Sequence, residues 1–381
     1  MQQSGLNRKD HSCLKRSIGM VSLVWNRRAC RQLEGSMSPR YSTALAEGKL
    51  IPFQTRINPM KNPKKVLVIQ QIAQPALDLF SARDDVTFEV LTDTSADAIA
   101  ARVGDVDAIT IRDAPLPATA LAGARNLKVI SRHGVGYDNI PVAFCSERGI
   151  PVTIIGDVNA VSVAEHTLFL MLAVAKNGAR FDRAVRAGDF GIRTRLATVE
   201  LRGKALLLVG YGRIGQEFAT RARPFGMSIT AYDPFVERDR FPDVLFFDSL
   251  QEALSKADVV SLHVPLGEKT RNLIDADALT QMKPGSILLN AARGGIVHEP
   301  SLIAALDAGH LHGAGLDVFA REPLPAGDPL LAREDIVFSP HCAALTSECL
   351  VEMGKATVRN VLAAFDGSLD TALVVNRSSL V

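Results

Sequence analysis

Short apolar runs alternate with longer segments of mixed polarity from Lys64 to the end of the chain. The apolar runs predict strands at 66–69, 86–91, 108–111, 128–130, 152–155, 205–209, 228–232, 259–264, 286–290, 314–318 and 336–338. The segments between them predict helices at 76–81, 95–103, 140–148, 161–177, 250–256, 277–281, 299–308 and 347–365, a short one after Pro329, and a polar arm at 178–200. Strands that alternate with helices form parallel sheets with right-handed crossovers, so the predicted fold class is α/β.

Residues 201–233 combine a predicted strand, a glycine turn, a helix and a second strand. Gly210, Gly212 and Gly215 give G-x-G-x-x-G where the first strand passes into the helix. The first glycine permits a tight turn, the second lets a pyrophosphate approach the backbone, and the third lets helix and strand pack closely. The helix N-terminus offers free N–H groups to the pyrophosphate. Asp233 ends the second strand, where an acid accepts hydrogen bonds from the ribose and repels a 2′-phosphate, so the sequence predicts NAD rather than NADP.

The first 59 residues differ from the rest of the chain in charge. They hold ten Lys or Arg against three Asp or Glu and show no strand or helix periodicity, whereas the remaining residues hold 33 against 38. Three interpretations are open for this segment: a transit peptide, a basic arm for an acidic partner, or a disordered or artefactual extension. We favour the third and predict that residues 1–60 are a basic, disordered extension before a folded part that starts near Met60.

Composition excludes several classes of protein. The chain is 47% hydrophobic and 22% charged with a net charge of +2, and the mildly acidic body beyond the first 59 residues has no basic footprint for nucleic acid. It also has no run of 18 apolar residues of the kind that crosses a membrane. Cysteines are few, odd in number and without a C-x-x-C pair, which favours reduced thiols in a cytoplasmic protein: Cys13, Cys30, Cys145, Cys342 and Cys349.

Three local patterns suggest metal or thiol chemistry but are incomplete. Cys342 follows His341 directly, and adjacent residues of an extended loop point to opposite sides. His310 and His312 lack a further ligand at a suitable spacing, and His166 follows a glutamate without the second histidine of H-E-x-x-H. We therefore predict neither a metal site nor a Cys–His nucleophile.

An arginine, a glutamate and a histidine each follow a separate predicted strand. Arg293 follows 286–290, Glu322 follows 314–318 and His341 follows 336–338, and the carboxyl ends of parallel strands share one edge of the sheet, where ligands bind. Arginine can hold a carboxylate with two parallel hydrogen bonds, and histidine can exchange a proton near neutral pH. A carboxylate beside the histidine favours its protonated form. These residue types suit hydride transfer to a 2-keto acid.

The chain resembles the D-isomer-specific 2-hydroxyacid dehydrogenases over roughly residues 62–381. The matching stretches are RHGVGYDNI (132–140), SVAEHTLFLML (162–172), GYGRIG (210–215), AYDP (231–234), LHVPL (262–266), KTRNLI (269–274), NAARGGIV (290–297), LDVFAREP (316–323) and SPHCAALT (339–346). The resemblance implies two α/β domains of Rossmann and flavodoxin type with the active site in the cleft between them. The substrate domain would comprise 61–156 and 347–381 and the NAD-binding domain 157–346, with a homodimer formed through the latter.

The resemblance also implies roles for individual residues. Arg293 corresponds to the arginine that orients the substrate, Glu322 to its carboxylate partner and His341 to the acid–base residue. The implied substrate-binding positions are Arg112 and the backbone amides of Val135 and Gly136. The implied cofactor-binding positions are Gly210, Gly212, Arg213, Ile214, Gly215, Asp233, Val264, Pro265, Ala291, Ala292, Asp317, Ala343 and Ala344.

One position departs from the phosphate-handling members of the family. Asp113 follows Arg112 where those members often have serine, and an acid there would repel a substrate phosphate. The chain ends soon after the last predicted helix, and we expect no appended regulatory domain. The sequence thus predicts an NAD-dependent dehydrogenase of a small D-2-hydroxy acid, with hydroxypyruvate, glyoxylate and 3-phosphoglycerate as candidate substrates. The alternatives are an NAD-sensing, corepressor-like interaction protein of the same fold and a formate-dehydrogenase-like enzyme, which the Glu322–His341 pairing disfavours.

Overall fold

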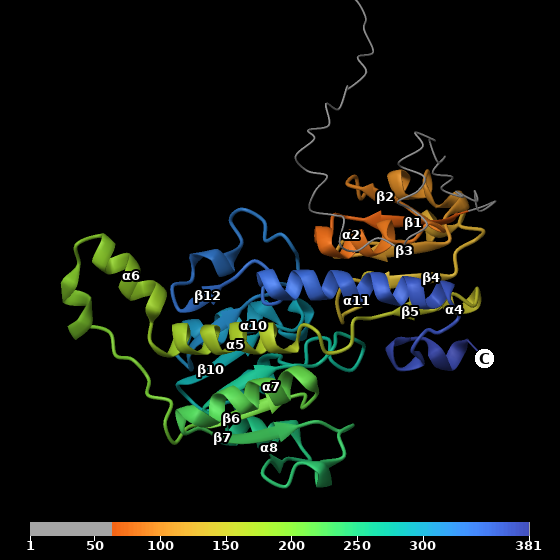
Figure 1. The fold of residues 1–381 in the computed structure, drawn as a ribbon. Helices are drawn as coiled ribbons and strands as arrows, with labels where there is room; N and C mark the ends of the chain where they lie inside the picture. The colour runs from red at the N-terminus through yellow and green to blue at the C-terminus, as the bar shows by residue number, and fades with distance from the viewer. Residues whose placement is uncertain (1–62, 381) are drawn as a thin grey trace, which may run out of the picture. The chain divides into compact units, whose positions relative to one another are not determined.

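A computed structural model describes residues 63–380, and the predictions for residues 1–60 lie outside this range. The described strands form two sheets in which every paired strand is parallel, which confirms the α/β class (Figure 1). The first sheet has five strands in the order β2-β1-β3-β4-β5. Their bounds are β1 (Lys64–Ile69), β2 (Val86–Leu91), β3 (Ala108–Ile111), β4 (Val129–Arg132) and β5 (Val152–Thr153).

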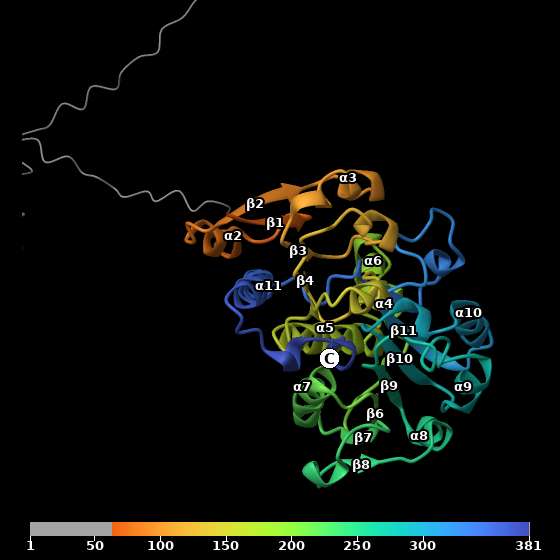
Figure 2. The same cartoon turned by 90° about the vertical axis from the view of Figure 1, so that its right-hand side faces the viewer.

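Helices cover both faces of the first sheet, which is why its inner strands β1 and β3 are mainly apolar and buried. One face packs on α2 (Gln74–Ser81) and α11 (Ser347–Phe365), through a core that includes Val68, Phe80 and Val358. The opposite face packs on α3 (Ala96–Ala100) and α4 (Val142–Glu147). Helix α11 comes from the end of the chain, so residues 347–365 lie beside α2, as Figure 2 shows.

The second sheet has seven strands in the order β12-β11-β10-β9-β6-β7-β8. The strand bounds are β6 (Ala205–Val209), β7 (Ser228–Tyr232), β8 (Leu245–Phe246), β9 (Val259–Leu262), β10 (Ser286–Asn290), β11 (Leu311–Leu316) and β12 (Ile336–Phe338). Its order reverses between β6 and β9, and such a switch point opens a crevice at the carboxyl ends of the strands. One face packs on α5 (Ala160–Ala175) and α7 (Arg213–Ala222), the other on α8 (Leu250–Lys256), α9 (Ala276–Gln281) and α10 (Glu299–Asp307).

Several stretches differ from the sequence prediction, among them the two-residue strand β8, which the apolar runs do not predict. The arm at 178–200 contains a helix, α6 (Gly178–Arg186), which projects from the rest of the described chain and has no buried residue (Figure 1). The composition of this arm is largely polar, and α6 packs no face against a core, so no buried apolar stripe marks the helix in the sequence. Strand β11 begins at Leu311, three residues before the predicted start, because Leu311 already pairs with Ser286 of β10, and it ends at Leu316, two residues before the predicted end. No helix among residues 63–380 is long and apolar enough to cross a membrane.

Candidate active site

The three glycines of the turn between β6 and α7 have different surroundings. Gly210 has a φ of +93°, and a Cβ there would lie 2.6 Å from the carbonyl oxygen of His263. A Cβ on Gly215 would lie 2.5 Å from the carbonyl oxygen of Gly210, so the first and third glycines are needed by the fold itself. A Cβ on Gly212 would meet nothing within 4 Å. Gly212 caps α7 at its N-terminus, so the open space lies where a pyrophosphate binds such helices.

The carboxylate of Asp233 is fixed against this turn. One oxygen accepts a hydrogen bond from the Tyr211 N–H at 2.8 Å, and the other accepts one from the Phe235 N–H at 2.9 Å. Arg238, the nearest following arginine, pairs with Asp248 at 2.6 Å. The fixed carboxylate of Asp233 can accept hydrogen bonds from the two free hydroxyls of an NAD ribose. Arg238 is already paired with Asp248, so it is not free to bind a 2′-phosphate.

A cleft of about 470 Å³ lies between the carboxyl ends of the two sheets and collects most of the predicted site residues. Its lining includes the predicted residues Arg112, Val135, Gly136, Ile214, Val264, Pro265, Ala291, Ala292, Arg293, Asp317, His341, Ala343 and Ala344. The other predicted cofactor residues form the glycine turn and its acid rather than the cleft wall. Glu322 lies behind His341, at a second cavity of about 430 Å³ with mainly apolar walls.

His341 and Glu322 form a hydrogen-bonded pair. The His341 Nδ1 lies 2.7 Å from a carboxylate oxygen of Glu322, whose other oxygen accepts the Phe319 N–H at 3.0 Å. The hydrogen bond to Glu322 raises the pKa of His341, against the opposing effect of burial. Burial works to raise the pKa of Glu322, but the hydrogen bonds from His341 and Phe319 hold it below its ordinary value. The pair leaves the Nε2 of His341 for a substrate.

Arg293 reaches from the seven-stranded sheet to the loop after β4. Its Nε donates to the Asp138 carboxylate at 2.8 Å, and one terminal nitrogen donates to the Ala292 carbonyl at 2.7 Å. A Cβ on Gly136 would lie 1.4 Å from the other terminal nitrogen, so only glycine fits beneath the guanidinium. The structure thus places Arg293 directly against the amides that the sequence predicts for the substrate carboxylate.

Sequence reasoning missed two residues that shape the same wall, Arg132 and Asp138. Arg132 is buried, and its guanidinium donates to the Gly136 carbonyl at 2.8 Å and to the Asp113 carboxylate at 3.0 Å. Both residues stand in the RHGVGYDNI stretch, but only spatial proximity reveals their partners. Asp113 is more than half exposed and lines the cleft, so its charge faces a bound substrate even though it pairs with Arg132.

Comparison with known proteins agrees with this geometry. The model of the D-isomer specific 2-hydroxyacid dehydrogenase NAD-binding domain matches residues 168–343. A glyoxylate reductase from Thermofilum pendens is 36% identical over 321 residues, which cover 81% of this chain and 94% of that protein. The chain belongs to the D-isomer-specific 2-hydroxyacid dehydrogenase family. The resemblance found in the sequence is therefore confirmed, and a nicotinamide cofactor with it.

Two further members of the family show the range of relatives. A D-3-phosphoglycerate dehydrogenase from Archaeoglobus fulgidus is 37% identical over 303 residues, which cover 78% of this chain and 56% of that protein. The chain thus spans little more than half the length of the phosphoglycerate dehydrogenases it matches. A solved NADPH-dependent glyoxylate/hydroxypyruvate reductase from Sinorhizobium meliloti is 27% identical with a TM-score of 0.75, covering 83% of this chain and 98% of that one.

Proposed function

We propose that this protein is an NAD-dependent oxidoreductase that interconverts a small 2-keto acid and the D-2-hydroxy acid. The observation that carries the proposal is the convergence of Arg293 and the Glu322–His341 pair on a cleft beside the glycine turn. The open space at Gly212 and the fixed carboxylate of Asp233 fit a dinucleotide. We assign the substrate domain to 61–156 and 347–381 and the NAD-binding domain to 157–346.

The mechanism assigns one task to each group. When bound, the nicotinamide supplies or accepts the hydride. The amides of Val135 and Gly136 and the guanidinium of Arg293 hold the substrate carboxylate, and the open Nε2 of His341 delivers a proton to the keto oxygen. Glu322 keeps His341 protonated for that step and fixes its ring. Acid–base catalysis contributes about 10²–10⁴-fold, so His341→Ala should lower kcat by that factor while NADH binding is retained.

Asp113 favours a substrate without a phosphate. A carboxylate beside the distal end of the substrate repels a dianion, so we propose the hydroxypyruvate or glyoxylate class ahead of a 3-phosphorylated acid. The test is oxidation of NADH followed at 340 nm with hydroxypyruvate, glyoxylate, pyruvate, phenylpyruvate and 3-phosphohydroxypyruvate. One unphosphorylated acid should stand out in kcat/KM. A flat panel despite tight NADH binding would replace the enzyme by the corepressor-like alternative.

The cofactor preference follows from Asp233. We expect kcat/KM to be at least about tenfold higher with NADH than with NADPH, because burying a phosphate beside a carboxylate costs more than a kilocalorie per mole. Asp233→Ser should narrow that ratio, while Asp277→Asn, which removes an exposed acid in the first turn of α9, should leave it in place. Equal values for both cofactors in the wild-type protein would refute the preference.

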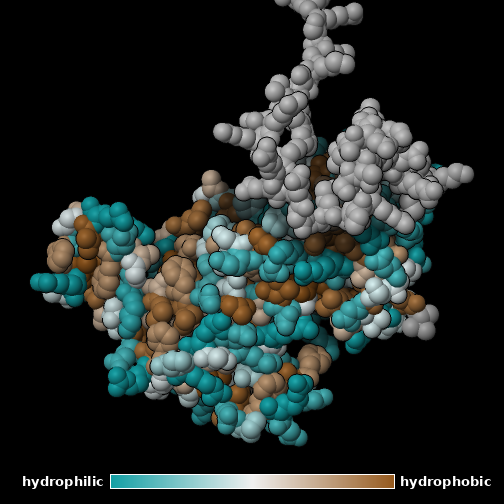
Figure 3. Space-filling model, in the orientation of Figure 1, coloured by the Kyte–Doolittle hydropathy of each residue, from teal (hydrophilic) through white to brown (hydrophobic). Residues whose placement is uncertain are grey.

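We also propose that two copies of the chain form a homodimer in the cytoplasm. Helix α6 and the segment after it carry exposed apolar side chains, with Val185 53% and Phe190 65% exposed, and Figure 3 shows apolar surface beside this arm. Apolar groups gathered on a projecting arm indicate a protein contact. Light scattering should give twice the chain mass, and Phe190→Asp should lower the measured mass toward that of one chain.

The three cysteines of the described chain are free, which suits a reducing compartment such as the cytoplasm.

A further inference from the structure

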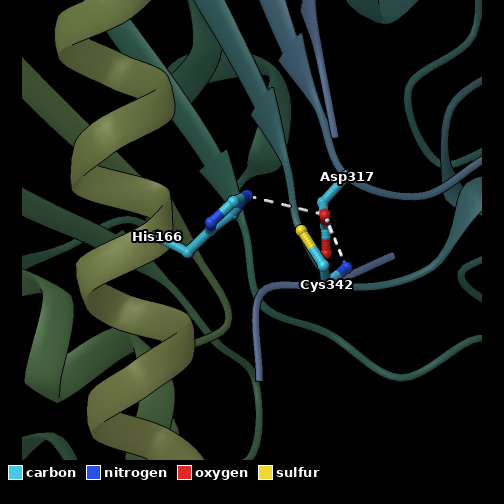
Figure 4. A group of neighbouring side chains, drawn as sticks. All are labelled: His166, Asp317 and Cys342. Atoms are coloured by element: carbon cyan, nitrogen blue, oxygen red, sulfur yellow. Dashed lines mark hydrogen bonds and ion pairs between the residues drawn. The ribbon is translucent and has the colours of Figure 1, made fainter. Parts of the chain in front are cut away.

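The side chains of His166, Asp317 and Cys342 form a cluster (Figure 4), and Cys342 directly follows His341 in the chain. His166 extends from α5, Asp317 follows β11, and Cys342 follows His341 in the loop after β12. The His166 Nε2 lies 2.7 Å from the Ser339 hydroxyl and 3.5 Å from a carboxylate oxygen of Asp317. The Ser339 hydroxyl donates to the same carboxylate oxygen at 2.6 Å. Because that hydroxyl has only one proton, it accepts from His166, and hydrogen bonds run from His166 through Ser339 to Asp317.

Asp317 holds the histidine loop at several points. Its carboxylate, which has no exposed surface, accepts the Cys342 N–H and the Ala343 N–H, both at 2.9 Å, in addition to the Ser339 hydroxyl. Its backbone carbonyl accepts the His341 N–H at 2.7 Å. The carboxylate is thus fully occupied by the loop, and burial raises the pKa of the Cys342 thiol, which keeps it protonated. These features describe a hydrogen-bonded brace rather than a vacant metal site.

The brace surrounds a strained residue. His341 has a φ of +52°, a left-handed conformation that is unfavourable for a residue other than glycine and persists only when its surroundings impose it. The hydrogen bonds from both sides of His341 to Asp317 impose it here. They aim the imidazole at Glu322, so the catalytic geometry depends on the position of Asp317 and Ser339.

We propose that His166 is a positioning residue for the acid–base step, which from α5 secures Ser339 and Asp317 and thereby the left-handed turn that aims His341. The proposal rests on the proposed function, because it concerns the same acid–base residue. His166 is not itself part of the cleft lining and does not contact the Glu322 carboxylate, so it acts through Ser339 and Asp317. The charged groups that face the His341 ring are Glu322, Arg293 and Asp113, with Asp317 on the backbone side.

Two variants at one position separate positioning from bulk. His166→Gln places an amide N–H near the original Nε2 and keeps the donor to Ser339, whereas His166→Leu fills similar space without a donor. A displacement of about 1 Å at a reacting group can cost about 100-fold, so we expect kcat to fall by about 10- to 100-fold in His166→Leu and by less than about threefold in His166→Gln. NADH affinity, measured by fluorescence, should stay within about twofold in both.

The matched control is Ser162→Ala. Ser162 lies one turn earlier on α5 and contacts the Thr346 hydroxyl at 3.1 Å, a similar contact that does not reach the loop at 339–343. The kcat of Ser162→Ala should match that of the wild type.

In His166→Leu the alkaline limb of the pH profile for keto-acid reduction should also move to lower pH, because a displaced His341 loses its hydrogen bond to Glu322. A change confined to folding stability would not move that limb.

The outcomes distinguish this proposal from the proposed function. If the wild type reduces no keto acid, the function fails. If the wild type does reduce a keto acid, two results would overturn the positioning role. One is a wild-type kcat and pH limb in His166→Leu, and the other is a His166→Gln variant as impaired as His166→Leu.

A metal role is tested separately with Zn²⁺ added to chelator-treated wild-type protein. One equivalent bound at micromolar affinity, and lost in Cys342→Ser, would replace the brace by a metal site. No such binding supports the brace.

Discussion

Replacing Glu322 by glutamine tests the origin of the raised His341 pKa. In the wild type one oxygen of Glu322 faces the His341 Nδ1 and the other faces the Phe319 N–H. An amide keeps only one acceptor. If its oxygen stays on Phe319, its NH₂ faces Nδ1, which must then be unprotonated. If it turns, its NH₂ opposes the Phe319 N–H. Both arrangements disfavour the imidazolium that the reduction requires.

The size of the effect follows from the geometry of the pair. A charge-assisted hydrogen bond contributes about 1.5–3 kcal/mol. The two side chains are 37% and 35% exposed, and we take solvent screening to reduce that value to about 1–2 kcal/mol. Since about 1.4 kcal/mol is tenfold in rate, kcat for keto-acid reduction at pH 8 should fall by about 5- to 30-fold in Glu322→Gln.

The pH dependence supplies the decisive assay. Reduction needs protonated His341, so kcat declines as the pH rises through the pKa of that residue. Because Glu322 raises this pKa, the alkaline limb of Glu322→Gln should lie at lower pH than that of the wild type, and the two rates should converge near pH 6. NADH binding should be unchanged. A profile that drops uniformly at every pH, with its limb in place, would refute the electrostatic role and leave Glu322 a purely steric support.

Further substitutions test three glycines, the carboxylate of Asp113 and the Glu322–His341 ion pair. Gly212→Ala should keep the melting temperature but weaken NADH binding, whereas Gly215→Ala should lower the melting temperature by several degrees, because overpacking costs about 1–3 kcal/mol; calorimetry and fluorescence titration that failed to separate them would contradict the two roles. Gly136→Ala should displace Arg293 and lower kcat/KM by about 100-fold without loss of NADH affinity. Asp113→Ser should raise kcat/KM for 3-phosphohydroxypyruvate relative to hydroxypyruvate, and an unchanged ratio would show that Asp113 does not select. The stability that the Glu322–His341 pair adds, read as the melting-temperature difference between wild type and Glu322→Gln, should be full between the unfolded Glu pKa of about 4.5 and the unfolded His pKa of about 6.5. It should disappear as the pH rises through the raised His341 pKa or falls through that of Glu322.

Local pattern determined the strands and the nucleotide turn. Buried parallel strands read as short apolar runs because both of their faces are covered, and the buried strands β3, β6 and β10 have the predicted bounds. The glycine spacing could be interpreted because Gly215 lies against the carbonyl of Gly210 within the same turn and Gly212 leaves the helix N-terminus open. The contact of Gly210 with the carbonyl of His263 is set by the tertiary structure. Arg293, Glu322 and His341 could be predicted together because the carboxyl ends of parallel strands share one edge. The three side chains lie in one region because the strands before them are parallel neighbours in one sheet, and the alternation of strands and helices already implies a parallel sheet.

The tertiary structure decided which side chains are partners. Arg293 pairs with Asp138 across 155 residues of chain, and His166 reaches Ser339 across 173. No periodicity encodes such pairs, since each depends on how two sheets and a helix pack, and a shift of one helical turn would replace the partner. The same reason explains helix α6, which packs no residue in the core although Phe181, Ala184 and Val185 recur at helical spacing in the sequence. The sequence by itself therefore determined the fold class and the reacting groups, because those depend on local sterics and on strand ends. Packing between distant elements determined how the reacting groups are held.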